Sequence, residues 1–271
     1  MLSPKLKLKA QESAKELQNT PVPIELFDYA PYSYTFDGQI KGIFPAILKR
    51  VFDEVGVQTK FKIAPAARIK FKFLNNELAI WPAELASIKD HIKREDLIMY
   101  NVLTAYASFS SLKENNLPRP SLDNVKGKKI AFIRGFKKEF EVYQARGAIL
   151  LEASNFDQLM QMLTKKRADY IGIAEIAAYY YAKKLEITEL VKIHPHIFSF
   201  PVGIIFNKKN KELADKFHLG FKKLVESGEY KKIILENTKR FHPKSEKLLI
   251  KEYSLINNDI GEEVITLSTQ P

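Results

Sequence analysis

The stretch that decides the fold of this chain is LVESGEYKKII, residues 224–234. The residues before it place apolar side chains at steps of three and four, which predicts a helix with one apolar face: Leu213, Phe217, Phe221 and Leu224. Gly228 ends that helix, because glycine adopts the left-handed conformation past a last turn without steric cost. A second short helix follows, with Tyr230 on its apolar face. The stretch therefore predicts a helix–glycine–helix corner.

The length and composition indicate a soluble globular protein. With 271 residues, the chain is long enough for one large domain or for two lobes of about 100 residues each. Its 45% hydrophobic and 28% charged residues are ordinary for this class. No apolar run is long enough to span a membrane, and residues 1–20 lack the apolar segment of a secretory signal. We therefore expect either that a signal has been removed or that the protein is cytosolic.

The charge and the absence of cysteine exclude several kinds of site. Zero cysteines exclude disulfides, thiolate metal sites and cysteine nucleophiles. The net charge of +11 is spread along the chain, and its densest clusters, such as residues 165–167, are only three residues long. Because such short runs rarely follow a phosphate backbone, we expect a solvated surface and no nucleic-acid partner.

Strand and helix patterns alternate twice along the chain. In the first half we expect a strand at 24–27, a hairpin turn at 36–39, a helix at 43–55, a strand at 57–63, a helix at 66–74 and an apolar run at 78–81. In the second half we expect a strand at 129–133, a helix at about 137–146, a strand at 148–151, a helix capped by Asn155, a strand at 168–173, a helix from Glu175 to Tyr181 and an extended run at 198–206. This order is typical of parallel sheets with crossover helices.

The two units predict an α/β fold with two lobes, each a mostly parallel sheet flanked by helices. Extended segments at 105–112 and 197–206 would cross between the lobes, and the C-terminal helices would return to the first. We assign lobe one to residues 21–106 plus 207–250 and lobe two to 110–202, with an N-terminal arm at 1–20 and a C-terminal tail at 251–271. Ligands approach the carboxyl ends of parallel strands, so the cleft between the lobes is the expected site.

Four motifs, in the same order, resemble those of the bacterial extracellular solute-binding proteins of family 3, the amino-acid type. They are DYAPY with GQIKGIF at 28–44, LDNVKGKKIA at 122–131, KKRADYI at 165–171 and the corner at 224–234. The similarity spans about residues 22–236. It implies a divergent member with the type 2 periplasmic-binding-protein fold. It also implies that the ligand is a small molecule and that the protein is a monomer in the periplasm, serving an ABC-transporter permease.

The resemblance assigns two charged residues to the ligand. Arg94 occupies the position of the arginine that pairs with the ligand carboxylate, although a surface arginine paired with Asp90 fits the pattern as well. Glu175 is the nearest match, displaced by one position, to the acidic residue that binds the ligand amine. It is equally consistent with a carboxylate placed at a helix N-terminus by the dipole.

The other candidates for the cleft are residues at which the chain departs from the family's motifs, and aromatic residues. Arg134-Gly135-Phe136 replaces the threonine-rich turn of lobe two, and Arg68 begins a helix directly after a strand. We expect Arg68 and Arg134 to favour a carboxylate-bearing ligand. The aromatic candidates, each of which is also consistent with a core position, are Tyr29, Tyr32, Trp81 and Phe136.

The remaining motifs do not indicate catalysis. The five histidines are scattered, and the only close pair, His194 and His196, has no carboxylate partner nearby in the sequence, so we expect no metal site and no cofactor. Nucleophile-elbow, phosphate-loop and dinucleotide motifs are absent from the sequence. The leading hypothesis is a binding protein without enzymatic activity that captures a small polar, amino-acid-like solute for an ABC importer. The alternatives are a cleft enzyme of the dehydratase type, with Glu175 as general acid, and a ligand-sensing domain of a receptor or regulator.

Overall fold

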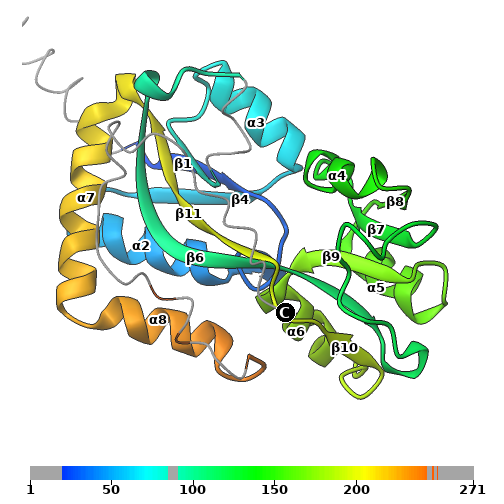
Figure 1. Ribbon diagram of the computed structural model, residues 1–271. Helices are drawn as coiled ribbons and strands as arrows, with labels where there is room; N and C mark the ends of the chain where they lie inside the picture. The colour runs from blue at the N-terminus through cyan, green and yellow to red at the C-terminus, as the bar shows by residue number, and fades with distance from the viewer. Residues whose placement is uncertain (1–19, 85–90, 243–245, 247–248, 250–271) are drawn as a thin grey trace, which may run out of the picture.

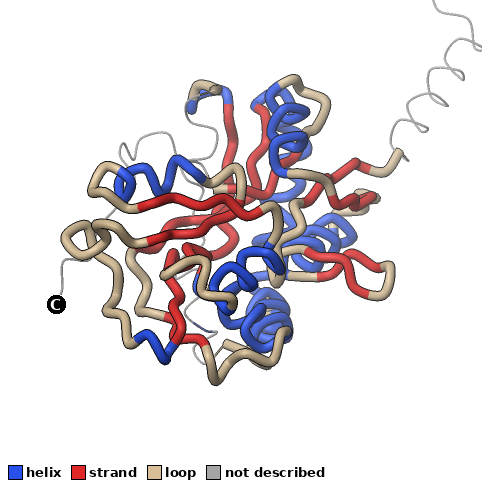
Figure 2. Tube along the Cα trace, turned by 90° about the vertical axis from the view of Figure 1, so that its right-hand side faces the viewer, coloured by secondary structure: helices blue, strands red, loops and turns tan. Residues whose placement is uncertain are grey.

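Two long antiparallel strands, β6 (Leu97–Leu112) and β11 (Phe198–Asn207), run through both halves of the molecule (Figure 1). The computed structural model describes residues 20–84, 91–242, 246 and 249. Figure 2 shows the strands running through the middle of the molecule with helices on more than one side of them. The two lobes are therefore joined by continuous sheet as well as by packing.

Lobe one contains the N-terminal elements and the last two helices. Its strands are β1 (Val22–Leu26), β2 (Tyr34–Phe36), β3 (Gln39–Lys41), β4 (Thr59–Ile63) and β5 (Ile80–Ala83). Its helices are α2 (Ile43–Glu54), α3 (Ala66–Leu74), α7 (Lys211–Glu226) and α8 (Glu229–Thr238). β1 pairs with β4 in parallel, and β5 pairs with β11 antiparallel. The apolar faces of α2, α7 and α8 meet in one core that also includes β1, β6 and β11.

Lobe two is built on the other part of β6. Its strands are β7 (Lys129–Ile133), β8 (Ile149–Ala153), β9 (Tyr170–Ala174) and β10 (Val191–Ile193), and its helices are α4 (Glu141–Gln144), α5 (Phe156–Thr164) and α6 (Glu175–Lys184). β7 pairs in parallel with both β8 and β9, while β9 pairs antiparallel with β6. Ala174 at the end of β9 lies opposite Ala107 near the middle of β6, so the carboxyl end of β9 faces lobe one.

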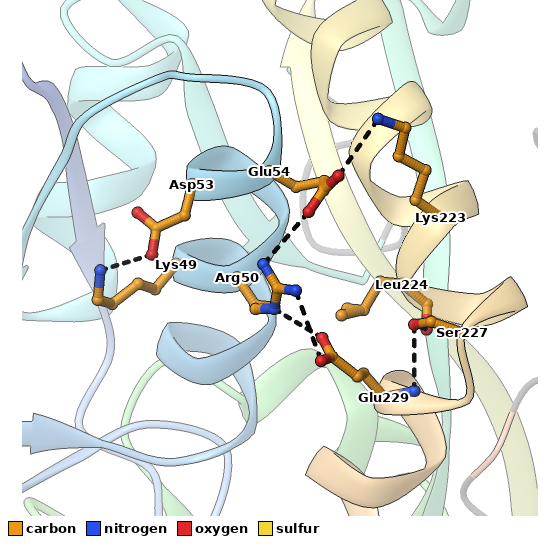
Figure 3. A network of polar contacts seen from close by, with 8 residues as sticks. All are labelled: Lys49, Arg50, Asp53, Glu54, Lys223, Leu224, Ser227 and Glu229. Carbon is orange, nitrogen blue, oxygen red and sulfur yellow. Dashed lines mark hydrogen bonds and ion pairs between the residues drawn. The ribbon is translucent and has the colours of Figure 1, made fainter.

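The C-terminal corner packs α7 and α8 onto α2. Gly228 has a φ of 76°, the left-handed conformation expected between two helices. Gly220 permits close approach, because a Cβ at this position would collide with the Val51 carbonyl oxygen of α2. Above this contact, Arg50 Nε lies 2.6 Å from Glu229 Oε2, and Lys223 Nζ lies 3.2 Å from Glu54 Oε1 (Figure 3). The helices are thus held by an apolar contact with exposed ion pairs above it.

Most of the predicted elements are confirmed, and two need correction. The helix expected at about 137–146 is shorter and is divided in two, because a 3₁₀ helix (Lys137–Phe140) precedes a single turn of α-helix, α4. The segment expected to be extended from residue 105 is part of a strand that begins at Leu97. The predicted arm, apart from Thr20, and the predicted tail lie outside the described residues, and the lobe boundaries stay a prediction. None of the described helices combines the length and apolar character needed to cross a membrane.

Candidate functional site

The loop after β1 lies at the junction of the two lobes. Its backbone caps α2, because Ile43 N donates to Pro31 O at 3.0 Å and Phe44 N donates to Tyr32 O at 2.9 Å. Gly42, with a φ of 123°, makes this approach possible, since a Cβ there would lie 2.6 Å from the Tyr32 carbonyl oxygen. The glycine of the Pro-Tyr…Gly motif therefore fixes the loop that carries the two predicted tyrosines.

Tyr29 links this loop to lobe two. Its hydroxyl oxygen accepts a hydrogen bond from Ala174 N at 3.0 Å, at the end of β9. Its ring stacks on Phe156 of α5, with centroids 4.3 Å apart and planes 18° apart. Phe136 lies at the edge of the same group, 6.5 Å from Tyr29 and 6.3 Å from Phe27. The structure thus brings together two predicted aromatic residues, Tyr29 and Phe136, across the lobes.

Tyr32 lies beside Tyr29 and is buried, with 5% of its surface exposed. The ring centroids of the two tyrosines are 5.1 Å apart. The Tyr32 hydroxyl oxygen is buried and has no hydrogen-bond partner among the described residues. Burial raises the pKa of Tyr32 well above its usual value, and the charges of Tyr29, Glu84 and Glu175 raise this pKa further. Tyr32 therefore carries a buried polar atom at the lobe junction, and the charges of Glu84 and Glu175 act on it.

Glu175 is the first residue of α6 and is 8% exposed. Its Oε1 lies 3.6 Å from Nε2 of the buried His242, and its Oε2 lies 3.9 Å from Nδ1 of His196. Tyr106 contacts His196, with ring centroids 4.8 Å apart, and its pKa is raised by burial and then by the Glu175 charge. Glu175 is therefore a buried carboxylate at the lobe junction, where segments from both lobes meet.

Sequence reasoning missed three residues of this cluster: Glu84, His196 and His242. Glu84 directly follows the carboxyl end of β5, and its charge raises the pKa of both tyrosines. The rule that ligands approach strand carboxyl ends would have found it. No comparable signal marks the two histidines, because their contact with Glu175 depends on long-range packing.

The predicted arginines do not gather in this cluster. Arg94 is in a 3₁₀ helix (Arg94–Asp96) directly before β6, where Leu97 lies opposite Asn207. Phe206, the neighbour of Asn207, lies opposite Ile80 at the start of β5. The register therefore places Arg94 at the end of these strands opposite to the carboxyl end of β5, and we do not assign it to the ligand.

The other two arginines are exposed. Arg68 is in the first turn of α3, next to the carboxyl end of β4, as expected. Arg134 follows β7 and pairs with Glu152, with 3.4 Å between Nε and Oε2 and with 71% of the arginine side chain exposed. Of the two, Arg68 lies near the carboxyl end of β4, while Arg134 forms a surface ion pair.

Trp81 lies in a core cluster with Phe73 of α3, at a centroid distance of 5.7 Å. It is 7% exposed, so its ring supports α3 against the sheet. From the sequence, each aromatic candidate was also consistent with a core position, and Trp81 occupies one. Trp81 therefore contributes to the site by holding the carboxyl end of β5 in place.

A groove of about 930 Å³ lies elsewhere, along α8. The described residues that line it come from α8 and its two ends: Gly228, Lys231, Lys232, Leu235, Glu236, Lys239 and Arg240. Polar groups from the two lobes do not converge on it, because lobe two contributes none of these residues. The buried cluster at the lobe junction is accordingly the better candidate. Among the described residues, no group of three or more metal-ligating side chains could hold a metal ion.

Comparisons with known structures agree with this architecture. An ancestral arginine-binding protein bound to arginine is 21% identical, with a TM-score of 0.70, and the match covers 81% of this chain and 98% of that one. An arginine-, lysine-, histidine-binding protein from Geobacillus stearothermophilus is 17% identical, with a TM-score of 0.68 and coverage of 84% and 99%. A histidine kinase sensor domain similar to periplasmic binding proteins is 18% identical, with a TM-score of 0.69 and coverage of 81% and 96%. At these identities, the likeness shows the fold alone.

A search of curated protein sequences finds no match. The sequence profile of one family matches residues 27–238, which is most of the chain and includes elements of both lobes and all of the junction cluster except His242. The family is described as solute-binding proteins, and the solved arginine-binding proteins above are similar in fold to this chain. The chain therefore belongs to the bacterial extracellular solute-binding proteins, family 3.

Proposed function

We propose that this protein binds a small polar, amino-acid-like solute between its two lobes and delivers it to the membrane permease of an ABC importer. The observation that carries the proposal is the meeting of polar groups from both lobes at one buried place, where Tyr29 of lobe one bonds to Ala174 of lobe two beside Glu175. A ligand held there would contact both lobes, so its binding energy would favour the closed arrangement.

The importer and the compartment are supported by similar proteins. One is an ABC uptake transporter substrate-binding protein from Streptococcus pneumoniae with bound histidine, and another is the substrate-binding protein of an amino acid ABC transporter. By analogy, we place this protein in the periplasm as a monomer that docks on a permease. A sensing role is the second candidate, because a histidine kinase sensor domain has the same fold.

Under the same proposal, the protein does not convert its ligand chemically. Ser111 and His194 form a Ser–His hydrogen bond of 2.9 Å, but both residues are buried, at 0% and 2% exposure. A nucleophile must reach its substrate, so this pair suits a structural role. Glu175 contacts histidines rather than a second carboxylate, which does not favour a dehydratase mechanism with paired acidic groups.

Calorimetric titration tests the binding proposal with a panel of amino acids, diamines, sugars and dicarboxylates. We expect one chemical class to bind and to raise the melting temperature, since ligand at 100 times its dissociation constant adds about 2.7 kcal/mol. Small-angle scattering with and without the ligand should show that both states are monomeric and that the liganded one is the more closed. If no class binds, or if a bound compound is chemically converted, the proposal is wrong.

An assay with the membrane permease then distinguishes the transport role from the sensing role. In proteoliposomes that contain the importer, the liganded protein should stimulate ATP hydrolysis. A protein that binds its ligand without this effect, but changes the phosphorylation of a membrane kinase, would support the sensing role instead.

A further inference from the structure

The chain beyond α8 crosses from lobe one to lobe two. His242 N donates to Thr238 O at 3.0 Å, so residues 240–242 continue directly from the end of α8. Phe241 packs against the core of lobe one. All three residues also contact α6 of lobe two, which lies beside the end of α8 (Figure 1). We call residues 240–242 the strap.

The first two residues of the strap contact the second half of α6. The Arg240 carbonyl oxygen accepts a hydrogen bond from Lys183 Nζ at 2.9 Å, in the last turn of that helix. The Phe241 ring meets the Tyr180 ring edge to face, with centroids 5.4 Å apart and planes 86° apart. The strap therefore approaches α6 at its carboxyl end and continues toward its amino end.

His242 completes the strap at the first turn of α6. Its ring lies 4.9 Å from the Tyr179 ring, and its Nε2 lies 3.6 Å from Glu175 Oε1. The other oxygen of Glu175 lies 3.9 Å from His196 Nδ1, so both histidines act on one carboxylate. Glu175, Tyr179 and Lys183 follow one another at steps of four and share one face of α6. The strap thus runs antiparallel to α6 along a single face.

Opening of the lobes would have to break these contacts. The strap is attached to lobe one through α8, whose side chains Tyr230 and Ile234 are buried in the core of that lobe. α6 follows β9 directly and belongs to lobe two. The strands that join the lobes, β6 and β11, shift register between Val202 and Gly203, and strands bend at such an irregularity. Rotation there would carry α6 away from α8, and the strap spans the two helices.

The sequence profile of the family ends at residue 238, so the strap lies beyond the part of the chain that the profile matches. We infer that the strap holds α6, and with it lobe two, against lobe one in the ligand-free protein, and that it thereby sets the equilibrium between closed and open lobes. The inference rests on the proposed binding function, to which it adds a means of regulation. A ligand that favours the closed arrangement binds more tightly when that arrangement is already populated, so the strap also contributes to affinity.

Distances between spin labels on the two lobes measure the ratio of closed to open protein without any ligand. The chain contains no cysteine, so Phe71→Cys on α3 and Gln161→Cys on α5, both at exposed positions, place one label on each lobe. We expect a population with the shorter, closed distance to dominate. Circular dichroism shows whether each variant is folded.

The contact between His242 and Glu175 has the largest expected effect. His242→Ala removes the ring from the first turn of α6, and the ratio of closed to open protein should fall about tenfold or more. Glu175→Gln should lower this ratio as well. The double variant should lower it little further than His242→Ala alone, because both substitutions remove the same contact.

Two neighbouring lysines of α6 give a matched pair of variants. Lys183→Met keeps a long side chain that cannot donate to the Arg240 carbonyl oxygen, and the ratio should fall about twofold. Lys184→Met is the control, because Lys184 is equally on the surface and bonds to Asp157 within lobe two, at 3.2 Å. It should leave the ratio unchanged. Because Lys183 is exposed, its variant should fold even if His242→Ala does not.

Two results would overturn the inference. An unchanged ratio in folded His242→Ala protein would show that the strap does not hold the lobes together. Equal effects of Lys183→Met and Lys184→Met would show that the contact with the strap is not what matters on α6. Both measurements are made without ligand, so either result leaves the proposed binding function standing. A protein that binds none of the compounds in the titration panel would contradict the proposed function and leave the measured distances unaffected.

Discussion

The two places where distant segments of this chain meet are built on different principles. At the C-terminal corner, α7 and α8 pack on α2 through fully buried apolar side chains, and charged pairs such as Arg50–Glu229 stay exposed above them (Figure 3). At the lobe junction, aromatic rings surround buried polar groups, including Glu175 and the Tyr32 hydroxyl. The corner is built for stability, while the junction retains polar atoms that only a ligand or a close neighbour can satisfy.

The difference follows from the cost of burying each kind of group. Apolar burial is favourable at any position where shapes fit, so the corner needs only regular periodicity and a glycine in the right place. A buried carboxylate or hydroxyl is costly unless it is paired, and proteins retain such groups where function requires them. The contrast between the two places would not hold if substitutions at the corner left the free energy of unfolding unchanged. It would also not hold if the junction behaved as ordinary apolar core.

The largest expected effect is a loss of stability when a buried side chain of the corner is truncated. Phe217 is 0% exposed, and its ring packs against Phe52, Tyr100 and Phe206 at centroid distances of 5.6–5.9 Å. Phe217→Ala should lower the free energy of unfolding by about 3–5 kcal/mol, because it removes buried surface and leaves a cavity. Urea unfolding followed by circular dichroism measures this change.

Leu219→Ala is the matched control, since Leu219 is on the same helix and is 51% exposed. It should change the free energy of unfolding by less than about 0.5 kcal/mol. Equal losses in the two variants would show that α7 is not held by its apolar face, and the account of the corner would fail.

The second largest expected effect is on the pH dependence of stability, through a buried histidine–serine pair in lobe two. His194 is 2% exposed, and its Nε2 lies 2.9 Å from Ser111 Oγ. Burial, with smaller effects from Lys192 and Arg119, lowers the pKa of His194 from 6.5 to about 4. Between these values the unfolded chain binds a proton that the folded chain does not, so stability falls as the pH falls from about 6.5 to about 4.

The expected loss over this range is about 3 kcal/mol, from a shift of this size at 1.36 kcal/mol per pKa unit. Unfolding in urea at pH 7.5 and at pH 4.5 measures it. The variant His194→Gln, which cannot take up the proton, should show a smaller drop between the two pH values, while His91→Gln, at an exposed position, should match the unsubstituted protein. A His194→Gln variant with an undiminished pH dependence would assign the acid sensitivity to other groups.

The sequence predicts the corner better than the junction, for a physical reason. Local properties are predicted correctly from neighbouring residues. They are the apolar period of α7, the left-handed conformation of Gly228, and the exact bounds of α3 and β7. Tyr29, Phe136 and Glu175 were also selected from the sequence, and the structure brings them to the lobe junction.

What the sequence did not predict depends on register and on long-range packing. Arg94 matched a motif position, but the pairing of Leu97 with Asn207 places it at the far end of the strands. His242 reaches Glu175 from beyond α8, and nothing in the local sequence indicates that contact. A resemblance transfers the order of motifs reliably, while the direction of a side chain is set by the strand pairing of this particular chain.

The smallest expected effect is on the hydrogen bond that joins the lobes. Tyr29→Phe removes the hydroxyl that accepts from Ala174 N and keeps the ring that stacks on Phe156. Loss of one such bond is worth about 1 kcal/mol, so the closed arrangement of the ligand-free protein should lose about fivefold in population relative to the open one. Distances between spin labels on α3 and α5 measure that population. Tyr34→Phe is the control, because the Tyr34 ring also contacts lobe two, at 5.5 Å from the Tyr180 ring, and this variant should leave the distances unchanged. If Tyr29→Phe also left the distances unchanged, the aromatic stacking alone would hold the lobes together, and the junction would resemble the corner more closely than its buried polar groups indicate.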